Sequence, residues 1–234
     1  MKNIVIAGDS YCASAGWPEQ LADQLGLQLS KHGYGAASWW ITRLSLVQLS
    51  KETIDNTEVI VLCHTHENRI PVSDMEILQT DWENIDSKNP KQLAVRLYWT
   101  HLYTPEFGQL FHWARYQWLK EVTEKFKHCK IIHLHCFPWS VEVTKDLKGL
   151  TVVPNLTSIS LNELGAKTER DIRNCGRANH FNEHNNQALA KELVRLINNY
   201  HEGITELDLT KFDLKTTKWN DWGKDENINM RLTW

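Results

Sequence analysis

Three short apolar runs constrain the fold of this chain more than any other feature of its sequence. They cover residues 3–7, 58–63 ("EVIVLC") and 130–135 ("KIIHLH"), and each is rich in β-branched side chains and bounded by polar residues. Apolar residues at helical spacing fill the intervening and later stretches 17–25, 44–54, 108–126 and 183–200. Strands that alternate with helices are typical of βαβ units, so the sequence predicts an α/β fold around a mainly parallel sheet.

The length of the chain favours one domain with an extension at its end. A chain of 234 residues, 41% of them hydrophobic, can bury one sizeable core. We expect the domain to span residues 1–200, with a surface insertion at about 70–107, where much of the sequence is polar and has no sustained period. Residues 201–234 have no helical period, and they form either an ordered arm or a flexible tail.

The net charge and the cysteine content of the chain limit its expected binding partners and its expected cellular compartment. A net charge of -3 leaves no broad basic surface, so nucleic acid is not an expected partner. No stretch approaches the roughly 20 apolar residues that span a bilayer, and the start lacks a secretion signal, so we expect no membrane partner. Five cysteines without a C-x-x-C pair favour a reducing cytoplasm over a disulfide framework or a zinc knuckle.

The first apolar run leads directly into Gly8, Asp9 and Ser10. A turn from the carboxyl end of a strand into a helix places its residues at the ligand-binding edge of a parallel sheet. The N–H groups and the dipole of the following helix would favour an anionic intermediate there. Ser10 is therefore a candidate nucleophile. The alternative is that Ser10 or Ser14 only caps the helix that begins near Trp17.

A second candidate lies near the other end, in "GRANHFNEHNNQALAKEL". His180 is expected on a loop just before the last helix, and a neutral imidazole there could take the proton from a serine hydroxyl. His184 is the rival, but it stands in the first turn of the helix, where local packing or hydrogen bonding is the better expectation. The alternative for both histidines is that they are ordinary solvated loop residues.

With these two blocks the chain resembles the SGNH (GDSL-type) hydrolase family. Gly8, Asp9 and Ser10 match the first block of the family, and His180 with Ala190 matches the spacing of its last block. The resemblance spans residues 4–197. It implies a three-layer α/β/α sandwich of the flavodoxin-like type, with a central, mainly parallel five-stranded sheet.

The resemblance also implies an oxyanion and substrate-binding set that comprises Gly35, Thr65, Asn68 and Asp9. The second block of the family donates a glycine N–H, for which Gly35 fits, with Gly33 as the alternate. A turn that needs a positive φ is the ordinary alternative for both glycines. Thr65 stands where the family has an asparagine, and either its hydroxyl or the Asn68 amide could donate that hydrogen bond. Losing one such donor typically costs about 10²- to 10³-fold in rate.

The acid that orients the histidine is the second departure from the family. It normally lies three residues before the histidine, where this chain has Arg177. Asp171 is the nearest carboxylate upstream, at a different offset, and a backbone carbonyl could hold the imidazole of His180 instead. Disrupting this role in a serine triad lowers turnover by about 10⁴. The sequence therefore predicts a weak or specialised enzyme.

Taken together, the resemblance implies an esterase that works through an acyl-enzyme intermediate. Ser10 attacks the ester, and His180 relays the proton. The implied substrate is a carbohydrate, lipid or small-molecule ester, and the implied chemistry needs no cofactor and no metal.

Two histidine pairs support an alternative from the residues alone. His64 with His66 and His133 with His135 each have H-x-H spacing at the end of an expected strand, where alternate side chains share a face. If the two strands are neighbours, four imidazoles could converge on zinc and activate a water molecule. Ordinary burial in the strand is the competing interpretation for His133 and His135.

A third interpretation is a binding module without catalysis on the same fold. The chain has eleven tryptophans, several of them in polar surroundings, and these could stack on sugars or bases. Arg43, Arg69 and Arg96 could hold an acidic ligand, although an arginine on a polar surface is usually only solvated. The departures at Thr65 and Arg177 favour this interpretation, and the intact Gly-Asp-Ser turn opposes it.

Overall fold

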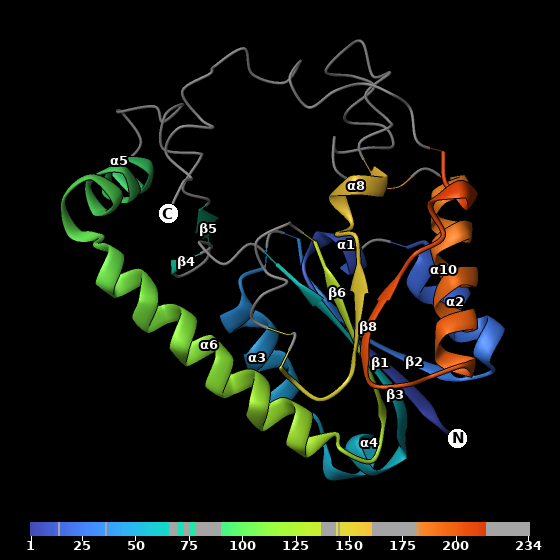
Figure 1. Ribbon diagram of the computed structural model, residues 1–234. Helices are drawn as coiled ribbons and strands as arrows, with labels where there is room; N and C mark the ends of the chain where they lie inside the picture. Colours follow the sequence, from blue (N-terminus) through green and yellow to red (C-terminus); the bar gives the residue numbers. More distant parts are fainter. Residues whose placement is uncertain are drawn as a thin grey trace.

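A six-stranded parallel sheet forms the centre of the molecule (Figure 1). The computed structural model describes residues 1–13, 15–35, 37–65, 70–72, 75–77, 90–136, 144, 146–160, 181 and 183–213. The strands lie in the order β2-β1-β3-β6-β7-β8, and all adjacent pairs are parallel. Their bounds are Asn3–Gly8 for β1, Gln28–Gly33 for β2, Thr57–His64 for β3, Lys130–His135 for β6, Leu150–Val153 for β7 and Gly203–Glu206 for β8.

Helices cover both faces of this sheet. The helices α1 (Ser10–Ala13), α2 (Trp17–Leu25) and α10 (Glu183–Asn198) pack on one face, while α3 (Trp39–Val47) and α6 (Pro105–Lys125) pack on the other. Both faces of strand β1 are apolar, because its successive side chains point to opposite sides of the sheet. Ile4 and Ile6 pack in the buried cluster that includes α2 and α10. Val5 and Ala7 pack in the cluster that includes α3 and α6. The predicted three-layer α/β/α architecture is confirmed.

Two details differ from the sequence-based expectation. The sheet has six strands where five were expected, and the additional strand β8 comes from the segment beyond residue 200. The single helix expected over residues 44–54 is two helices, because α3 ends at Val47 and α4 (Lys51–Asn56) begins after a new cap. The Ser50 hydroxyl accepts a hydrogen bond from the Thr53 N–H at 3.0 Å, which is a typical N-cap.

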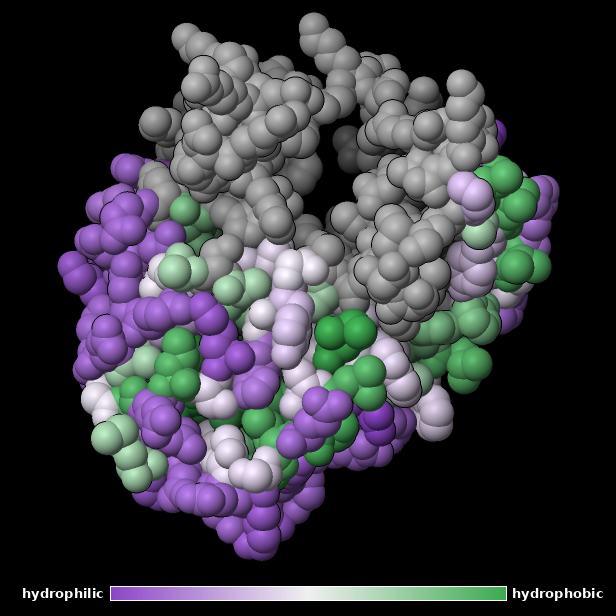
Figure 2. Space-filling model, turned by 180° about the vertical axis from the view of Figure 1, so that it is seen from behind, coloured by the Kyte–Doolittle hydropathy of each residue, from purple (hydrophilic) through white to green (hydrophobic). Residues whose placement is uncertain are grey.

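The expected surface insertion contains regular structure. Strands β4 (Ile70–Val72) and β5 (Met75–Ile77) form an antiparallel pair, and α5 (Pro90–Leu97) continues into the π-helical turn η2 (Tyr98–Leu102) before α6. Large apolar side chains are exposed along α5, η2 and the first half of α6: Leu93, Leu97, Leu102, Phe107, Leu110 and Trp113. Hydrophobic residues gather at the upper right edge in Figure 2, the side that α5 and α6 take when Figure 1 is turned round. No helix in the described ranges combines the length and apolar composition needed to cross a bilayer.

The chain returns to the sheet after α10. Strand β8 pairs with β7, and the Leu207 N–H donates a hydrogen bond to the Val153 carbonyl at 2.8 Å. The short 3-10 helix η5 (Leu209–Lys211) follows, and the side chains of Leu207 and Phe212 are buried in the core. Residues 203–213 therefore pack as part of the α/β unit.

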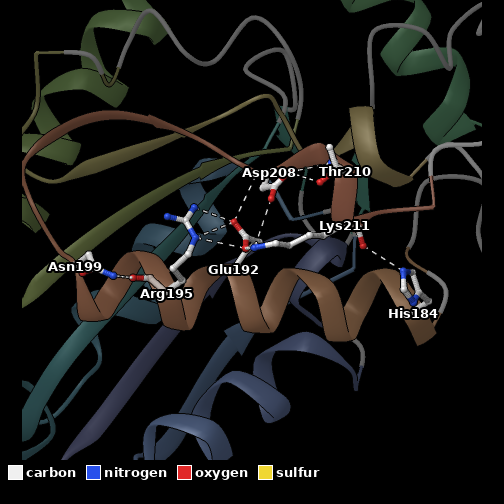
Figure 3. A network of polar contacts seen from close by, with 7 residues as sticks. All are labelled: His184, Glu192, Arg195, Asn199, Asp208, Thr210 and Lys211. Atoms are coloured by element: carbon white, nitrogen blue, oxygen red, sulfur yellow. Dashed lines mark hydrogen bonds and ion pairs between the residues drawn. The ribbon is translucent and has the colours of Figure 1, made fainter.

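A buried carboxylate ties this returning segment to α10 (Figure 3). Glu192 of α10 is 1% exposed, forms an ion pair with Arg195 at 2.8 Å, and forms a second ion pair with Lys211 of η5. Burial raises the pKa of Glu192, but hydrogen bonds from Arg195 and Lys211 outweigh it and leave the pKa below its usual value. The carboxylate is therefore ionised near neutral pH and attracts both cations.

Glu192→Gln should weaken this attachment. The amide keeps the shape of the side chain but loses the charge that pairs with Arg195 and Lys211. Because both cations are nearly half exposed, we expect a loss of about 1–3 kcal/mol in the free energy of unfolding rather than the full cost of an unpaired buried charge. Urea unfolding at neutral pH measures the change. Glu206→Gln, at an exposed position of β8, is the control, and an equal loss there would refute the assignment.

Candidate active site

Three of the predicted site residues follow neighbouring strands at the same edge of the sheet. Gly8 at the end of β1 is paired with Gly33 of β2 and with Cys63 of β3. Ser10, Gly35 and Thr65 each lie two residues beyond this row. Because the carboxyl ends of parallel strands share one edge, these three residues follow adjoining strands at the place where α/β folds bind ligands.

The Gly-Asp-Ser turn is held by close backbone contact and by the Asp9 carboxylate. A Cβ on Gly8 would lie 2.4 Å from the Cys63 carbonyl oxygen, so only glycine fits there. Asp9 is fully buried, and its Oδ1 accepts hydrogen bonds from the Tyr11 N–H at 3.0 Å and from the Cys136 thiol at 3.2 Å. Asp9 therefore fixes the turn from the inside.

Ser10 is the first residue of α1 and is 8% exposed. The helix α1 that follows the turn is a single turn, and the longer helix α2 begins at Trp17. The N-cap of α2 is Gly16, and the adjacent Trp17 N–H donates to the Asn186 Oδ1 at 3.0 Å. The N-cap of that helix is therefore not Ser10, and Ser14 lies outside the described residues.

Gly33 is a close-approach glycine rather than a turn glycine. A Cβ there would lie 2.6 Å from the Cys12 carbonyl oxygen, because the end of β2 presses against α1, and its φ is not in the left-handed region. Gly35 lies two residues later and is exposed. Of the two glycines, Gly35 is the more exposed.

Several predicted residues lie outside the described residues: His180, Asp171, Asn68, Arg177 and His66. The neighbour of His180 is described, however, and it contacts the neighbour of Ser10. The rings of Phe181 and Tyr11 are 5.6 Å apart between centroids and tilted by 58°. The rival His184 donates from Nε2 to the Lys211 carbonyl at 3.1 Å, which agrees with the local hydrogen-bonding role expected for it (Figure 3).

The histidines of β3 and β6 form a buried, hydrogen-bonded chain on the face of the sheet that α3 and α6 cover. His133 donates from Nε2 to the Lys148 carbonyl at 3.0 Å, so in the neutral ring Nδ1 is the acceptor for His64 Nε2 at 2.9 Å. His135 stacks on His64 with ring centroids 5.0 Å apart, and its Nε2 lies 2.7 Å from the Thr144 hydroxyl. The two strands are neighbours, as the metal hypothesis required, with His64 paired to His135.

This arrangement does not support the metal hypothesis. Nε2 of His64 and Nδ1 of His133 point at each other, so those two atoms cannot both bind one ion. Within the described ranges, no group of three or more His, Cys, Asp or Glu side chains is placed to hold a metal. The sequence indicated the shared face of the imidazoles, but not that they bond to one another.

The buried imidazoles should make the fold sensitive to acid. Burial lowers the pKa of His133 to about 4. Burial and, to a smaller extent, the charge of Arg115 lower the pKa of His135 to about 2. Burial and the two neighbouring histidines lower the pKa of His64 well below 6.5. The unfolded chain binds these protons near pH 6.5 and the folded chain does not, so the stabilisation is full above that pH and is lost as the pH falls from about 6.5 toward 4.

We expect the free energy of unfolding to fall by up to about 1.4 kcal/mol per pH unit for each of the three imidazoles over that range. Urea unfolding between neutral pH and pH 5 measures the slope. His133→Gln should make it shallower, and His201→Asn, at an exposed position, should leave it unchanged. A native protein whose stability is flat over this range would contradict the prediction.

The sequence did not reveal Arg115 and Trp118, which α6 places beside these histidines. Both are buried, with Arg115 1% exposed and Trp118 5% exposed. The one available signal was a charged residue within the buried face of α6, in "FHWARYQWL". Residues of this kind usually have a partner or a role in the interior.

The sequence matches no family model, and no curated protein matches it. Among solved structures the chain is similar to a protein from Parabacteroides merdae that is described as a candidate GDSL-like lipase. The two chains are 12% identical, the match covers 82% of this chain and 94% of the other, and the TM-score is 0.45. A likeness at this level carries no inference about activity, which must come from the residues of the site.

Proposed function

We propose that this chain is a serine hydrolase that cleaves an ester through an acyl-enzyme intermediate. The observation that carries the proposal is the common placement of Ser10, Gly35 and Thr65, each two residues beyond one paired row of β1, β2 and β3. The contact between Tyr11 and Phe181 adds support, because it joins the chain neighbours of Ser10 and His180.

In the proposed reaction, the Ser10 Oγ attacks the carbonyl carbon of the ester and His180 takes the hydroxyl proton. The carbonyl oxygen becomes an oxyanion that accepts hydrogen bonds from the N–H groups of Ser10 and Gly35. His180 then protonates the leaving alkoxide as the bond to the alcohol breaks. Water, activated by the same imidazole, releases the acyl group from Ser10.

The third oxyanion donor is Asn68 or Thr65, and the burial of the Thr65 side chain speaks against Thr65. Thr65 is only 2% exposed, and its hydroxyl is shielded from solvent. Either Asp171 or a backbone carbonyl orients His180. Without the usual acid we expect slow turnover, on a carbohydrate, lipid or small-molecule ester whose acyl group the residues do not specify.

Covalent labelling tests the proposal directly. A fluorophosphonate probe should attach to the native protein once, which raises its intact mass by that of one adduct, and should not attach to Ser10→Ala. Ser158→Ala, at an exposed position of α8 (Thr157–Ser160), should label like the native protein. If Ser10→Ala labels as well as the native protein, Ser10 is not the nucleophile. If nothing labels and no ester is cleaved, the non-catalytic binding module becomes the better interpretation.

A further inference from the structure

Two neighbouring helices, α3 and α6, each carry an apolar stripe that is exposed to solvent. Helix α3 already buries Trp39 and Leu46 against the sheet, so its exposed stripe is a second apolar side of the same helix. The exposed side chains of both helices are spaced three or four residues apart, as on one side of a helix. We call them the α3–α6 face, and their exposed fractions lie between 37% and 61%: Trp40, Leu44, Val47, Phe107, Leu110 and Trp113.

Aromatic contacts join the two stripes into one surface. The ring centroid of Trp39 lies 5.6 Å from that of Trp40 in the same helix and 6.5 Å from that of Phe111 in α6. Phe111 in turn lies 4.8 Å from Phe107 between ring centroids. Hydrophobic side chains accordingly appear along the right-hand side of Figure 2, which is the side of α6 when Figure 1 is turned round.

The apolar area of the α3–α6 face matches what a protein–protein interface needs. Large apolar side chains present about 150–250 Å² when nothing covers them, so the exposed parts of these six amount to roughly 500 Å². A standard interface buries about 800 Å² of each partner, and about 60% of that area is apolar. A patch of this size on a soluble protein usually marks a binding surface.

The charged side chains on the two stripes have opposite signs. Arg43 lies one turn after Trp40 on α3, and its guanidinium carbon is 5.1 Å from the centroid of the Trp40 ring. Glu106 lies one turn before Leu110 on α6 and is exposed. Within the described part of the chain, neither charge forms an ion pair. Surfaces that bind anionic lipid are rich in Lys and Arg, whereas this face, with one cation and one anion, is complementary to itself.

We propose that the α3–α6 face binds the same face of a second copy of this chain, in a dimer with two-fold symmetry. In such an interface every contact occurs twice. Arg43 therefore pairs with Glu106 of the partner subunit, and Glu106 pairs with the partner's Arg43. Leu110 and Trp113 form the apolar centre of the interface. This inference does not depend on the proposed esterase activity, and its test uses no ester.

Sedimentation equilibrium over a range of protein concentrations tests the dimer. The native chain should approach twice its mass of 27.3 kDa at roughly 10–100 μM. Leu110→Gln removes an apolar side chain from each subunit, so it should raise the Kd of the dimer by about 10- to 100-fold. Ile204→Gln is the matched control, because Ile204 is also exposed but lies in the edge strand β8, and it should keep the native Kd.

Exchanging the two charges tests the contact between subunits. Arg43→Glu alone and Glu106→Arg alone would each bring like charges together across the interface, and each should raise the Kd by about 10-fold. The double variant Arg43→Glu/Glu106→Arg restores opposite charges, so its Kd should return to within about threefold of the native value. The double variant also controls for folding, since it carries both substitutions.

Three results would overturn the proposal. A native chain with a mass of 27.3 kDa at every concentration would mean that no dimer forms, and binding of that monomer to phosphatidylglycerol vesicles would assign the face to a lipid surface. A native Kd in Leu110→Gln would place the interface elsewhere. A double charge variant that dimerises no better than the single variants would contradict the two-fold contact. The native protein alone decides the first point, so the test stands even if a variant does not fold.

Discussion

Replacing Ser10 with alanine should abolish cleavage of an activated short-chain ester such as p-nitrophenyl acetate. The substitution removes only the hydroxyl group, and the oxygen of that group forms the bond to the acyl group in the proposed mechanism. Removing a nucleophile costs several orders of magnitude, so we expect kcat/KM to fall by about 10⁴-fold, or to the background rate if native turnover is slow. Rates at a range of substrate concentrations, for the native protein and the variant, measure the loss.

Two comparisons guard against a trivial explanation. The urea midpoint of Ser10→Ala should stay close to that of the native protein, since the side chain is small and the turn is held by Asp9. Ser158→Ala should retain the native rate. Hydrolysis by Ser10→Ala at the native rate would show that ester cleavage, if present, uses another residue.

Gly8→Ala should produce a large loss of stability. The added methyl would lie 2.4 Å from the Cys63 carbonyl oxygen, and the backbone has φ +156°, which L-residues with a side chain rarely adopt. Strands β1 and β3 would have to separate at the centre of the sheet. Summing overpacking and backbone strain, we expect a loss of about 3–5 kcal/mol in the free energy of unfolding.

Gly26→Ala is the matched control for the backbone effect. Gly26 has φ +66° at the end of α2, and a Cβ there would meet nothing within 4 Å. We expect a cost of about 1 kcal/mol, from the left-handed conformation alone. Urea unfolding of both variants separates steric contact from strain, and similar losses would refute the role given to the contact with Cys63.

The central strands could be predicted because burial on both faces makes them continuously apolar. Strand β3 has the run from Val59 to Cys63 buried, and the sequence showed it directly. Strand β8 was missed for the converse reason. It is a four-residue edge strand with the sequence "GITE", largely exposed, and its place depends on pairing with β7 and on Glu192 of α10, contacts that local sequence does not encode.

The residues of the candidate site also include some that the sequence predicts and some that it does not. Ser10 and Thr65 were predictable because each follows a recognisable strand, and the register of parallel strands brings their positions to one edge. Arg115 and Trp118 were not, because α6 is far from β3 in the chain and only packing brings it beside the buried imidazoles. The roles of His180, Asp171 and Asn68 stay predictions.

The returning segment has a practical consequence for anyone who shortens this chain. Cutting it after Tyr200 would remove β8 and leave the N–H and C=O groups of β7 unpaired along a new sheet edge. Exposed edges of this kind recruit strands from other molecules. If a truncated protein precipitates, the cause would therefore be the exposed edge of β7, and not a failure of the remaining five strands to fold.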